Sequence, residues 1–394
     1  MTTFSVQFLG CKVSHVDAHE VRERLLADGH VERDEAQVAI VNTCCVTNEA
    51  VAKSRKEAAR AARTHERVYV TGCGANLAAD AFAGLPENVV VVAKRSEETP
   101  EFVAGDVGAI GCVQADARLD RVRAFVKVQD GCSFSCNFCV IPLVRGSSRS
   151  RNAEAVLAEI RRRVAQGHRE IVLTGINLGC YRDRGAGYDL PRLVREAGGL
   201  VERLRLSSIE INHVNDELIR ALRETPTVAK HLHVPLQSGD DGVLRAMGRR
   251  YTVATYLRRL APLQDEFNLT SDVIVGFPAE DERAFANTLD TARAGGLTKI
   301  HVFPYSPRPG TKTAADDAVA PQVKRERGAR LRQASHEACV ERWHSKVGAD
   351  DLVLVDRPGR GYGDDYTPWL VDGEIGEFVA VRGARVTDEG VLAA

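Results

Sequence analysis

Apolar and amphipathic stretches alternate over residues 1–95. Strand-like runs such as TFSVQFLG, VAIVNTC and RVYVTGC are separated by VDAHEVRERLLADG and NEAVAKSRKEAARAAR, where apolar residues recur at helical spacing. Strands that alternate with helices predict a parallel sheet with helices on its faces. We therefore expect a small parallel α/β domain at the N-terminus.

A second and longer series of the same kind occupies residues 123–345. Its strand-like runs are RAFVKVQDGC, EIVLTGIN, RLRLSSIE, HLHVPLQS, LTSDVIVGFP and KIHVFPYS, with helical stretches between them. Because these units are fewer than the eight of a complete barrel, they predict a partial (β/α)6 barrel with its chemistry at the carboxyl ends of the strands. Residues 96–122 have mixed polarity and no sustained period, and we interpret them as a linker.

The pattern changes again towards the C-terminus. A basic helical segment, PQVKRERGARLRQASHEACVERWHSKVG, leads into residues 346–394, where short β-rich runs are broken by Gly, Pro and Asp. Short strands separated by turn residues predict a small antiparallel β domain. The expected fold class is therefore α/β with one all-β module at the end.

Composition narrows the class of protein. The chain has 394 residues, of which 44% are hydrophobic and 27% charged, as in soluble globular proteins of two or three domains. The net charge of -1 argues neither for nor against binding to nucleic acid, so only local basic patches could indicate such binding. The opening MTTFSVQFLGCK lacks a signal-peptide pattern, and no run reaches the roughly 18 apolar residues of a membrane span, so we expect a cytoplasmic protein. The 10 cysteines are then expected to be metal ligands or catalytic groups, because the cytosol keeps thiols reduced.

Three of these cysteines, Cys132, Cys136 and Cys139, follow the first barrel strand with C-x3-C-x2-C spacing. A structural zinc site takes four ligands, whereas three thiolates on a four-iron cube leave one iron open to a substrate or cofactor. The alternatives are three buried cysteines in a turn, or a zinc site that a distant histidine completes.

Three more, Cys11, Cys44 and Cys73, stand at the carboxyl ends of three N-terminal strands. Ligands of open α/β sheets bind at that edge, so these cysteines are expected to converge, unless they pack as small hydrophobic residues. Cys45 adjoins Cys44, and only one of the two should face the site because successive strand residues point to opposite faces. The remaining cysteines have no partners at ligand spacing and are expected to be buried: Cys112, Cys180 and Cys339.

These features together resemble the radical S-adenosylmethionine methylthiotransferase family over essentially the whole chain. The resemblance is carried by LGCKV, VNTC, VTGC, DGCSFSCNFCVIPLVRG, VPLQSGDDGVLRAMGRRYT, DVIVGFPAED and YSPRPGT. Within the family, KVQDGC, RGSSRSR, LTGINLG and RLSSIEI are most similar to the branch that methylthiolates threonylcarbamoyladenosine in tRNA. Other branches act on isopentenyladenosine in tRNA or on an aspartate of a ribosomal protein.

The resemblance implies two [4Fe-4S] clusters. Cys132, Cys136 and Cys139 would hold one, whose open iron is chelated by S-adenosylmethionine; one electron would then release a 5′-deoxyadenosyl radical. Cys11, Cys44 and Cys73 would hold an auxiliary cluster that carries the sulfur to be transferred. Cys44 is preferred to Cys45 because the family motif ends at NTC.

Contacts to S-adenosylmethionine are expected at Thr174, Gly175 and Asn177 after the second barrel strand. Ser208 and Glu210 after the third strand, and Gly276 after the fifth, complete the expected set. The alternative for each is an ordinary turn or cap residue.

Arg145, Arg149 and Arg151 follow the cysteine loop and are expected to meet RNA phosphates or the carboxylate of a threonylcarbamoyl group. The C-terminal module resembles the RNA-binding TRAM domain. Its Tyr362, Tyr366 and Trp369 would stack on bases or else form its core.

The implied function is conversion of threonylcarbamoyladenosine, next to the tRNA anticodon, to its 2-methylthio form. The implied partners are the tRNA anticodon stem-loop and an electron donor such as flavodoxin or ferredoxin, while the sulfur donor stays open. The alternatives are an isopentenyladenosine methylthiotransferase and a noncatalytic iron–sulfur RNA-binding redox sensor.

Overall fold

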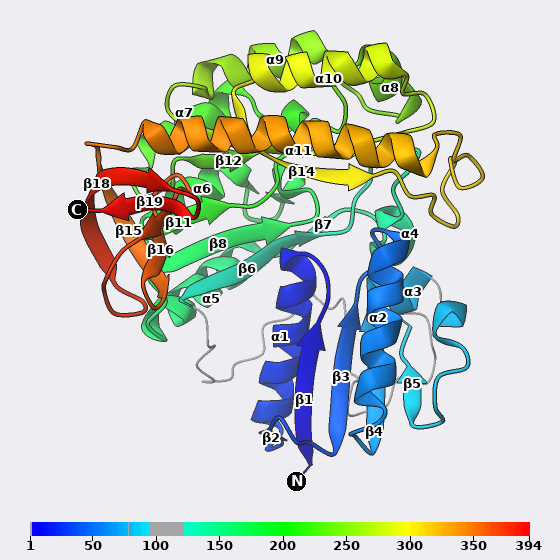
Figure 1. The fold of residues 1–394 in the computed structure, drawn as a ribbon. Helices are drawn as coiled ribbons and strands as arrows, with labels where there is room; N and C mark the ends of the chain where they lie inside the picture. Colours follow the sequence, from blue (N-terminus) through cyan, green and yellow to red (C-terminus); the bar gives the residue numbers. More distant parts are fainter. Residues whose placement is uncertain (1, 78, 94–121) are drawn as a thin grey trace.

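The computed structural model describes residues 2–77, 79–93 and 122–394, which form three parts (Figure 1). All of the predicted linker except Val122 lies outside the described residues, and so does Cys112. Among the helices of the described part, none has the length and apolar character needed to cross a membrane.

The N-terminal part is a parallel five-stranded sheet in the order β2-β1-β3-β4-β5. Its central strand β3 (Val38–Thr43) is buried on both faces. Val38 and Ile40 pack against one helix, α1, and Ala39 and Val41 pack against the other, α2. The predicted α/β domain is therefore confirmed. Its other elements are β1 (Thr3–Phe8), α1 (Lys12–Ala27), β2 (Val31–Glu32), α2 (Asn48–Ala61), β4 (Arg67–Gly72), α3 (Cys73–Leu77), η1 (Ala79–Phe82) and β5 (Val89–Val91).

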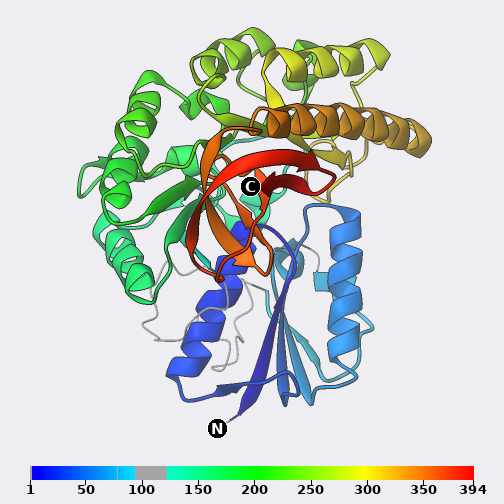
Figure 2. The same ribbon diagram turned by 60° about the vertical axis from the view of Figure 1, so that its left-hand side comes forward.

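The middle part is the predicted partial barrel of six parallel strands. They are β6 (Arg123–Asp130), β8 (Glu170–Gly175), β11 (Arg203–Leu206), β12 (His231–His233), β13 (Asn268–Val275) and β14 (Leu297–Pro304). Hydrogen-bonded pairing joins β6, β8 and β11 on one side and β12, β13 and β14 on the other, and a bridge between Leu204 and Val228 connects the halves. Helices cover the outside and share one continuous apolar core with the strands (Figures 1 and 2).

The remaining elements of this part connect or cover the strands. They are α4 (Ile141–Arg145), β7 (Arg149–Ser150), α5 (Ala153–Ala165), η2 (Leu178–Cys180), β9 (Arg182–Asp183), β10 (Tyr188–Asp189), α6 (Leu190–Gly198), η3 (Ile211–His213), α7 (Asp216–Glu224), α8 (Asp241–Ala246), α9 (Val253–Leu260), η4 (Ala261–Leu263), α10 (Glu282–Ala294) and α11 (Pro321–His344). The long helix α11 is the predicted basic segment, and it leads into the C-terminal part.

The C-terminal part is a closed barrel in the order β15-β16-β17-β19-β18. Its strands are β15 (Asp350–Arg357), β16 (Arg360–Tyr362), β17 (Pro368–Leu370), β18 (Phe378–Thr387) and β19 (Gly390–Ala393). All pairs are antiparallel as predicted except β17 with β19, which is parallel. Trp369 is 1% exposed among the apolar residues of this barrel. It therefore forms core, whereas Tyr362 and Tyr366 are half-buried and lie against Arg123.

Buried ion pairs join the N-terminal part to the partial barrel. The ammonium of Lys127 on β6 lies 2.7 Å from Asp17 and 2.9 Å from Glu20, both on α1. Arg145 at the end of α4 also pairs with Asp17, at 2.6 Å. Removing Asp17 would leave Lys127 and Arg145 buried without this carboxylate, so the two ion pairs of Asp17 hold α1 against the barrel.

The C-terminal barrel lies against the starts of the parallel strands (Figures 1 and 2). Arg205 on β11 donates to the backbone carbonyls of Gly363 and Asp364, at 2.7 and 2.8 Å. Asp365 accepts from Arg342 of α11 at 2.8 Å, and although burial alone would raise its pKa, Lys346 and Arg342 lower it to about 2. The carboxyl ends of the barrel strands are thus left to face the N-terminal part.

Candidate functional site

The loop after β6 carries Cys132, Cys136 and Cys139. Gly131 starts it with a φ of +67°, and a Cβ there would lie 2.2 Å from the carbonyl oxygen of Ser147, so the turn requires glycine. Cys132 accepts from the backbone N–H of Phe134 at 3.4 Å and also from the side chain of Asn177. The three sulfurs are close enough for the charge of one thiolate to raise the pKa of a neighbouring thiol.

Burial governs the protonation of this loop. It raises the pKa of Cys132, and it raises that of Cys139 to about 12. Arg249 is the nearest compensating charge, because its guanidinium donates to the Cys136 sulfur at 3.4 Å. Metal binding must therefore displace protons from these thiols.

Cys11, Cys44 and Cys73 stand at the ends of β1, β3 and β4, and the sheet brings them together as neighbours. Cys44 is close enough to both of the others for their charges to raise its pKa, although burial is the larger cause. A Cβ on Gly10 would lie 3.5 Å from that of Cys44, and one on Gly74 would lie 3.2 Å from the Cys44 carbonyl oxygen. The strand ends are thus packed closely around Cys44.

Cys45 differs from Cys44 in its surroundings. Its side chain is completely buried, packs with Val140 and Val144, and hydrogen-bonds Cys73. That hydrogen bond and the guanidinium of Arg145, which donates to the Cys73 sulfur at 3.1 Å, together lower the pKa of Cys73 to about 7 against the effect of burial. Cys73 is therefore the thiol of this group that ionises most readily.

The two groups of cysteines face each other across the domain boundary. Cys45 and Cys73 pack against Val140 and Val144, which directly follow Cys139 in the barrel. A pocket of about 190 Å³ is lined by Val46 and Thr47 from one side and by Cys139 and Gln237 from the other. Gln237 has a φ of +66°, a strained value for a residue with a side chain. Such strain often accompanies functional sites.

The expected cofactor contacts divide into two kinds. Thr174 and Asn177 are buried, and neither Thr174 Oγ1 nor Asn177 Oδ1 has a hydrogen-bond partner among the described residues. Gly175 is held between strands, since its N–H donates to Ser207 at 3.3 Å. Ser208 is half-buried. Two orphaned oxygens beside the cysteine loop thus favour a polar ligand there.

Glu210 and Gly276 already have protein partners. The carboxylate of Glu210 accepts from Asn212 at 2.9 Å and lies 3.4 Å from Arg249. A Cβ on Gly276 would lie 2.4 Å from Cγ of Lys324, so the packing of α11 accounts for this glycine. For these two positions the cap and packing alternatives describe the geometry better.

The three arginines expected to contact RNA lie mostly inside the protein. Arg145 is bound by Asp17, Asp130 and Cys73, and Arg151 by Glu159 at 2.6 Å, and both guanidinium groups are buried. Arg149 pairs with Asp130 at 3.3 Å but its side chain is 32% exposed. The geometry therefore leaves only Arg149 of the three in reach of an external ligand, because buried carboxylates compensate the others.

Arg249 is the functional residue that sequence reasoning missed. Its side chain is 8% exposed and bridges Cys136 and Glu210. Its position in the MGRRYT motif was the available signal, since that motif carries part of the family resemblance.

The donor chemistry fits iron–sulfur clusters. Each group supplies three thiols and one arginine, and the barrel group adds the orphaned oxygens of Thr174 and Asn177. Among the described residues no three cysteine sulfurs lie within 4.8 Å of one another, so neither group closes on a single ion. Cysteine thiolates spaced around a larger centre are the usual ligands of a four-iron cube.

Comparison with known proteins places the fold in a class. Residues 126–292 match the Radical SAM superfamily, and residues 3–93 match the uncharacterized protein family UPF0004. The radical S-adenosylmethionine methyltransferase TsrM of Kitasatospora setae shares the fold, with a TM-score of 0.53 and 13% identity over 80% of this chain and 77% of that one.

Full-length relatives are more specific. A threonylcarbamoyladenosine tRNA methylthiotransferase of Bacillus subtilis is 37% identical over 97% of this chain and 94% of its own length. One of Thermotoga maritima is 31% identical over 100% and 96%. A tRNA-2-methylthio-N(6)-dimethylallyladenosine synthase of Sphingopyxis alaskensis is 32% identical over 93% and 90%. The chain belongs to the radical S-adenosylmethionine methylthiotransferase family. It is an enzyme that transfers a sulfur-containing group, with S-adenosylmethionine and two [4Fe-4S] clusters as cofactors.

Proposed function

We propose that this enzyme converts threonylcarbamoyladenosine, next to the anticodon of tRNA, to 2-methylthio-threonylcarbamoyladenosine. The observation that carries the proposal is the meeting of two cysteine groups from separate sheets, because Val140 and Val144, which follow Cys139 in the chain, pack against Cys73. Transfer of sulfur to an unactivated carbon needs both a radical source and a sulfur carrier within reach of one substrate atom. The names of the relatives from Bacillus subtilis and Thermotoga maritima support the choice of base.

We assign the barrel cluster to Cys132, Cys136 and Cys139, and the auxiliary cluster to Cys11, Cys44 and Cys73. When bound, S-adenosylmethionine supplies the radical that removes the C2 hydrogen of adenine and the methyl group of the product, and the auxiliary cluster supplies the sulfur. Thr174 and Asn177 would hydrogen-bond the cofactor, because their buried oxygens have no other partner among the described residues. The apolar side chains of Val140 and Val144 would exclude water from the space between the groups.

Contact with the anticodon stem-loop is assigned to the half-buried Arg149 and to the C-terminal barrel, with domain limits at about residues 95, 123 and 346. Neutralising phosphates releases counterions, so the affinity for tRNA should fall as salt is raised. The electron donor we propose is a protein such as flavodoxin or ferredoxin.

Nucleoside mass spectrometry of tRNA from a deletion strain tests the proposal. The 2-methylthio product should vanish and its threonylcarbamoyladenosine precursor should accumulate, and the gene on a plasmid should restore both. Loss of the 2-methylthio-isopentenyl nucleoside instead would contradict the proposal and favour the neighbouring branch of the family.

A redox sensor built on the same clusters would leave tRNA unmodified. Reductive cleavage of S-adenosylmethionine by the reconstituted protein separates the two functions, because a sensor has no need of that reaction. We expect release of 5′-deoxyadenosine, and its absence in protein with full iron content would exclude the enzyme.

A further inference from the structure

A cavity of about 750 Å³ lies where the three parts of the molecule meet. Its wall includes Lys12 at the start of α1, residues of β12, β13 and β14, and Tyr362 and Tyr366 of the C-terminal barrel. None of the six cysteines assigned above lines it. It is therefore a separate space, although Lys12 directly follows Cys11.

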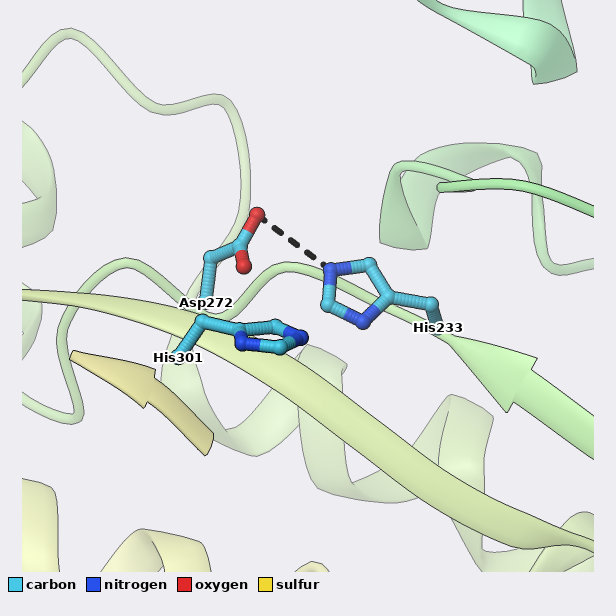
Figure 3. Close-up of side chains that lie close together, drawn as sticks. All are labelled: His233, Asp272 and His301. Atoms are coloured by element: carbon cyan, nitrogen blue, oxygen red, sulfur yellow. Dashed lines mark ion pairs between the residues drawn. The ribbon is translucent and has the colours of Figure 1, made fainter. Parts of the chain in front are cut away.

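Three polar side chains from adjacent strands lie close together (Figure 3), and two of them, His233 and His301, line this cavity. Nε2 of His233 lies 3.2 Å from the carboxylate of Asp272, and the ring centroid of His301 lies 5.7 Å from that of His233. Nδ1 of His233 is 2.9 Å from the hydroxyl of Thr270, which fixes the ring. Asp272 itself lines the smaller pocket beside Cys139, so its contact with His233 connects the cavity wall to the cysteine loop.

Two lysines give the cavity a positive charge. Lys12 and Lys299 both line it, and neither forms an ion pair with any described residue. Other cations of the wall are neutralised, since Arg123 lies 2.9 Å from Asp356 and Arg342 lies 2.8 Å from Asp365. Both lysines are near enough to His301 to lower its pKa, although burial is the larger cause.

The charge decides between two kinds of ligand. The nitrogen and oxygen atoms of His233, Asp272 and His301 lie within 4.8 Å of one another, a spacing that a divalent cation could use. Two uncompensated ammonium groups beside them would repel that cation and attract an anion. Hydrogen-bonding side chains around a local positive charge are better suited to a carboxylate that carries further polar groups.

We propose that this cavity binds the threonylcarbamoyl substituent of the substrate base, with Lys12 and Lys299 on its carboxylate and His233 and His301 on its hydroxyl and ureido groups. This inference rests on the function proposed above. An isopentenyl substituent is apolar and uncharged, and it would leave the two ammonium groups unpaired. The cavity would therefore select the substrate branch as well as hold the base.

Binding of two anticodon stem-loop RNAs to the reconstituted enzyme tests this site. The RNAs are identical except that one carries threonylcarbamoyladenosine and the other adenosine beside the anticodon. We expect the wild-type protein to prefer the modified loop by roughly tenfold to a hundredfold, the range of one or two charge-assisted hydrogen bonds. Lys299→Met and Lys12→Met should each lose most of this preference while keeping their affinity for the unmodified loop. Lys56→Met, an exposed lysine on α2 away from the cavity, is the matched control.

The remaining outcomes separate this inference from the proposed function. If the lysine variants lose affinity equally for both loops, the lysines contact RNA phosphates. If the variants keep the wild-type preference for the modified loop, the lysines do not recognise the threonylcarbamoyl group. Either result overturns the inference. A wild-type protein that lacks the preference and leaves the methylthio product unformed would instead overturn the proposed function. Stoichiometric Zn²⁺ that is retained by the wild type and lost in Asp272→Asn would establish a metal site in place of the carboxylate site. Iron content in Lys12→Met must match the wild type, because Lys12 adjoins Cys11.

Discussion

The two groups of cysteines are assembled in opposite ways. Cys132, Cys136 and Cys139 lie in one short loop, so local geometry alone brings them together. Cys11, Cys44 and Cys73 lie on three strands, and only the pairing of β1, β3 and β4 makes them neighbours. The first group is therefore as stable as its loop, whereas the second requires an intact sheet.

The groups also differ in electrostatics. Burial raises the pKa of Cys132 and Cys139, and Arg249, the arginine beside this loop, comes from the same barrel. Cys73 in the other group has its pKa lowered to about 7 by Cys45 and by Arg145, which belongs to the neighbouring domain. The N-terminal group thus depends on the contact between domains, and the barrel group does not. The following predictions test this difference.

Cys132→Ala should have the largest effect. Loss of one of three thiolates should remove the barrel cluster, and with it all reductive cleavage of S-adenosylmethionine and all methylthiolation. Iron content should fall by about half, since the auxiliary cluster remains. Release of 5′-deoxyadenosine and iron analysis measure both effects, and Cys339→Ala, which changes a half-buried cysteine on α11, should match the wild type. Residual cleavage near the wild-type rate would contradict the ligand assignment.

Cys44→Ala should abolish sulfur insertion but not cleavage of S-adenosylmethionine. Iron should again fall by about half, but cleavage of S-adenosylmethionine should continue while sulfur insertion stops, because the radical source lies in the other domain. Cys45→Ala should change iron content little, since its side chain packs among Val140 and Val144. If Cys45→Ala loses the cluster and Cys44→Ala keeps it, the two assignments must be exchanged.

Arg145→Met should weaken the N-terminal group through the domain contact. It leaves Asp17 and Asp130 buried without this partner, a change that costs about 3–5 kcal/mol, and it should raise the pKa of Cys73. The urea midpoint of the cluster-free protein and its ultraviolet thiolate absorbance measure the two effects. Arg149→Met removes a more exposed partner of Asp130 and should cost less than about 1 kcal/mol. Equal costs in the two variants would show that burial does not set the strength of this contact.

Glu20→Gln should have the smallest effect, and one that depends on pH. Burial raises the pKa of Glu20 to about 7 against the charge of Lys127, with Asp17 nearby. A raised acid pKa favours the protonated folded state, so this contribution to stability is present below about pH 4.5 and is lost as the pH rises through 7. The variant should therefore be more stable than the wild type at pH 8 by about 1–2 kcal/mol, and equal to it at pH 4.

Thermal melts of the cluster-free protein at the two pH values measure this difference. Glu49→Gln, on the exposed surface of α2, should leave the melting temperature unchanged at both pH values. A Glu20→Gln variant that is less stable than the wild type at pH 8 would mean that the ion pair with Lys127 outweighs the cost of burial.

Much of this molecule could be predicted from local patterns in the chain. The alternation of apolar and amphipathic runs predicted the parallel sheet, the partial barrel and the C-terminal β module, because strand and helix periods are properties of neighbouring residues. The C-x3-C-x2-C loop was visible for the same reason. The short parallel pairing of β17 with β19 was not visible, since it depends on how the small barrel closes.

The partners of charged residues could not be predicted from such local patterns. Arg145, Arg151 and Arg249 belong to basic runs that look alike in the sequence, yet their side chains are only 7%, 3% and 8% exposed and each lies beside a specific partner. Whether a guanidinium meets solvent, a carboxylate or a thiol depends on residues more than a hundred positions away, as with Arg145 and Asp17. No local pattern encodes such a pairing.

The sequence by itself therefore determined the order of the elements, the two sets of cysteines and the class of cofactor they suit. The tertiary structure decided how these parts act together: which arginine lies beside which thiol, which lysines have no carboxylate partner among the described residues, and where one cavity opens between the three parts. The physical reason is the distance along the chain over which each interaction acts. Hydrophobic periodicity acts over a few residues, whereas charge compensation and burial depend on every element packed around a side chain.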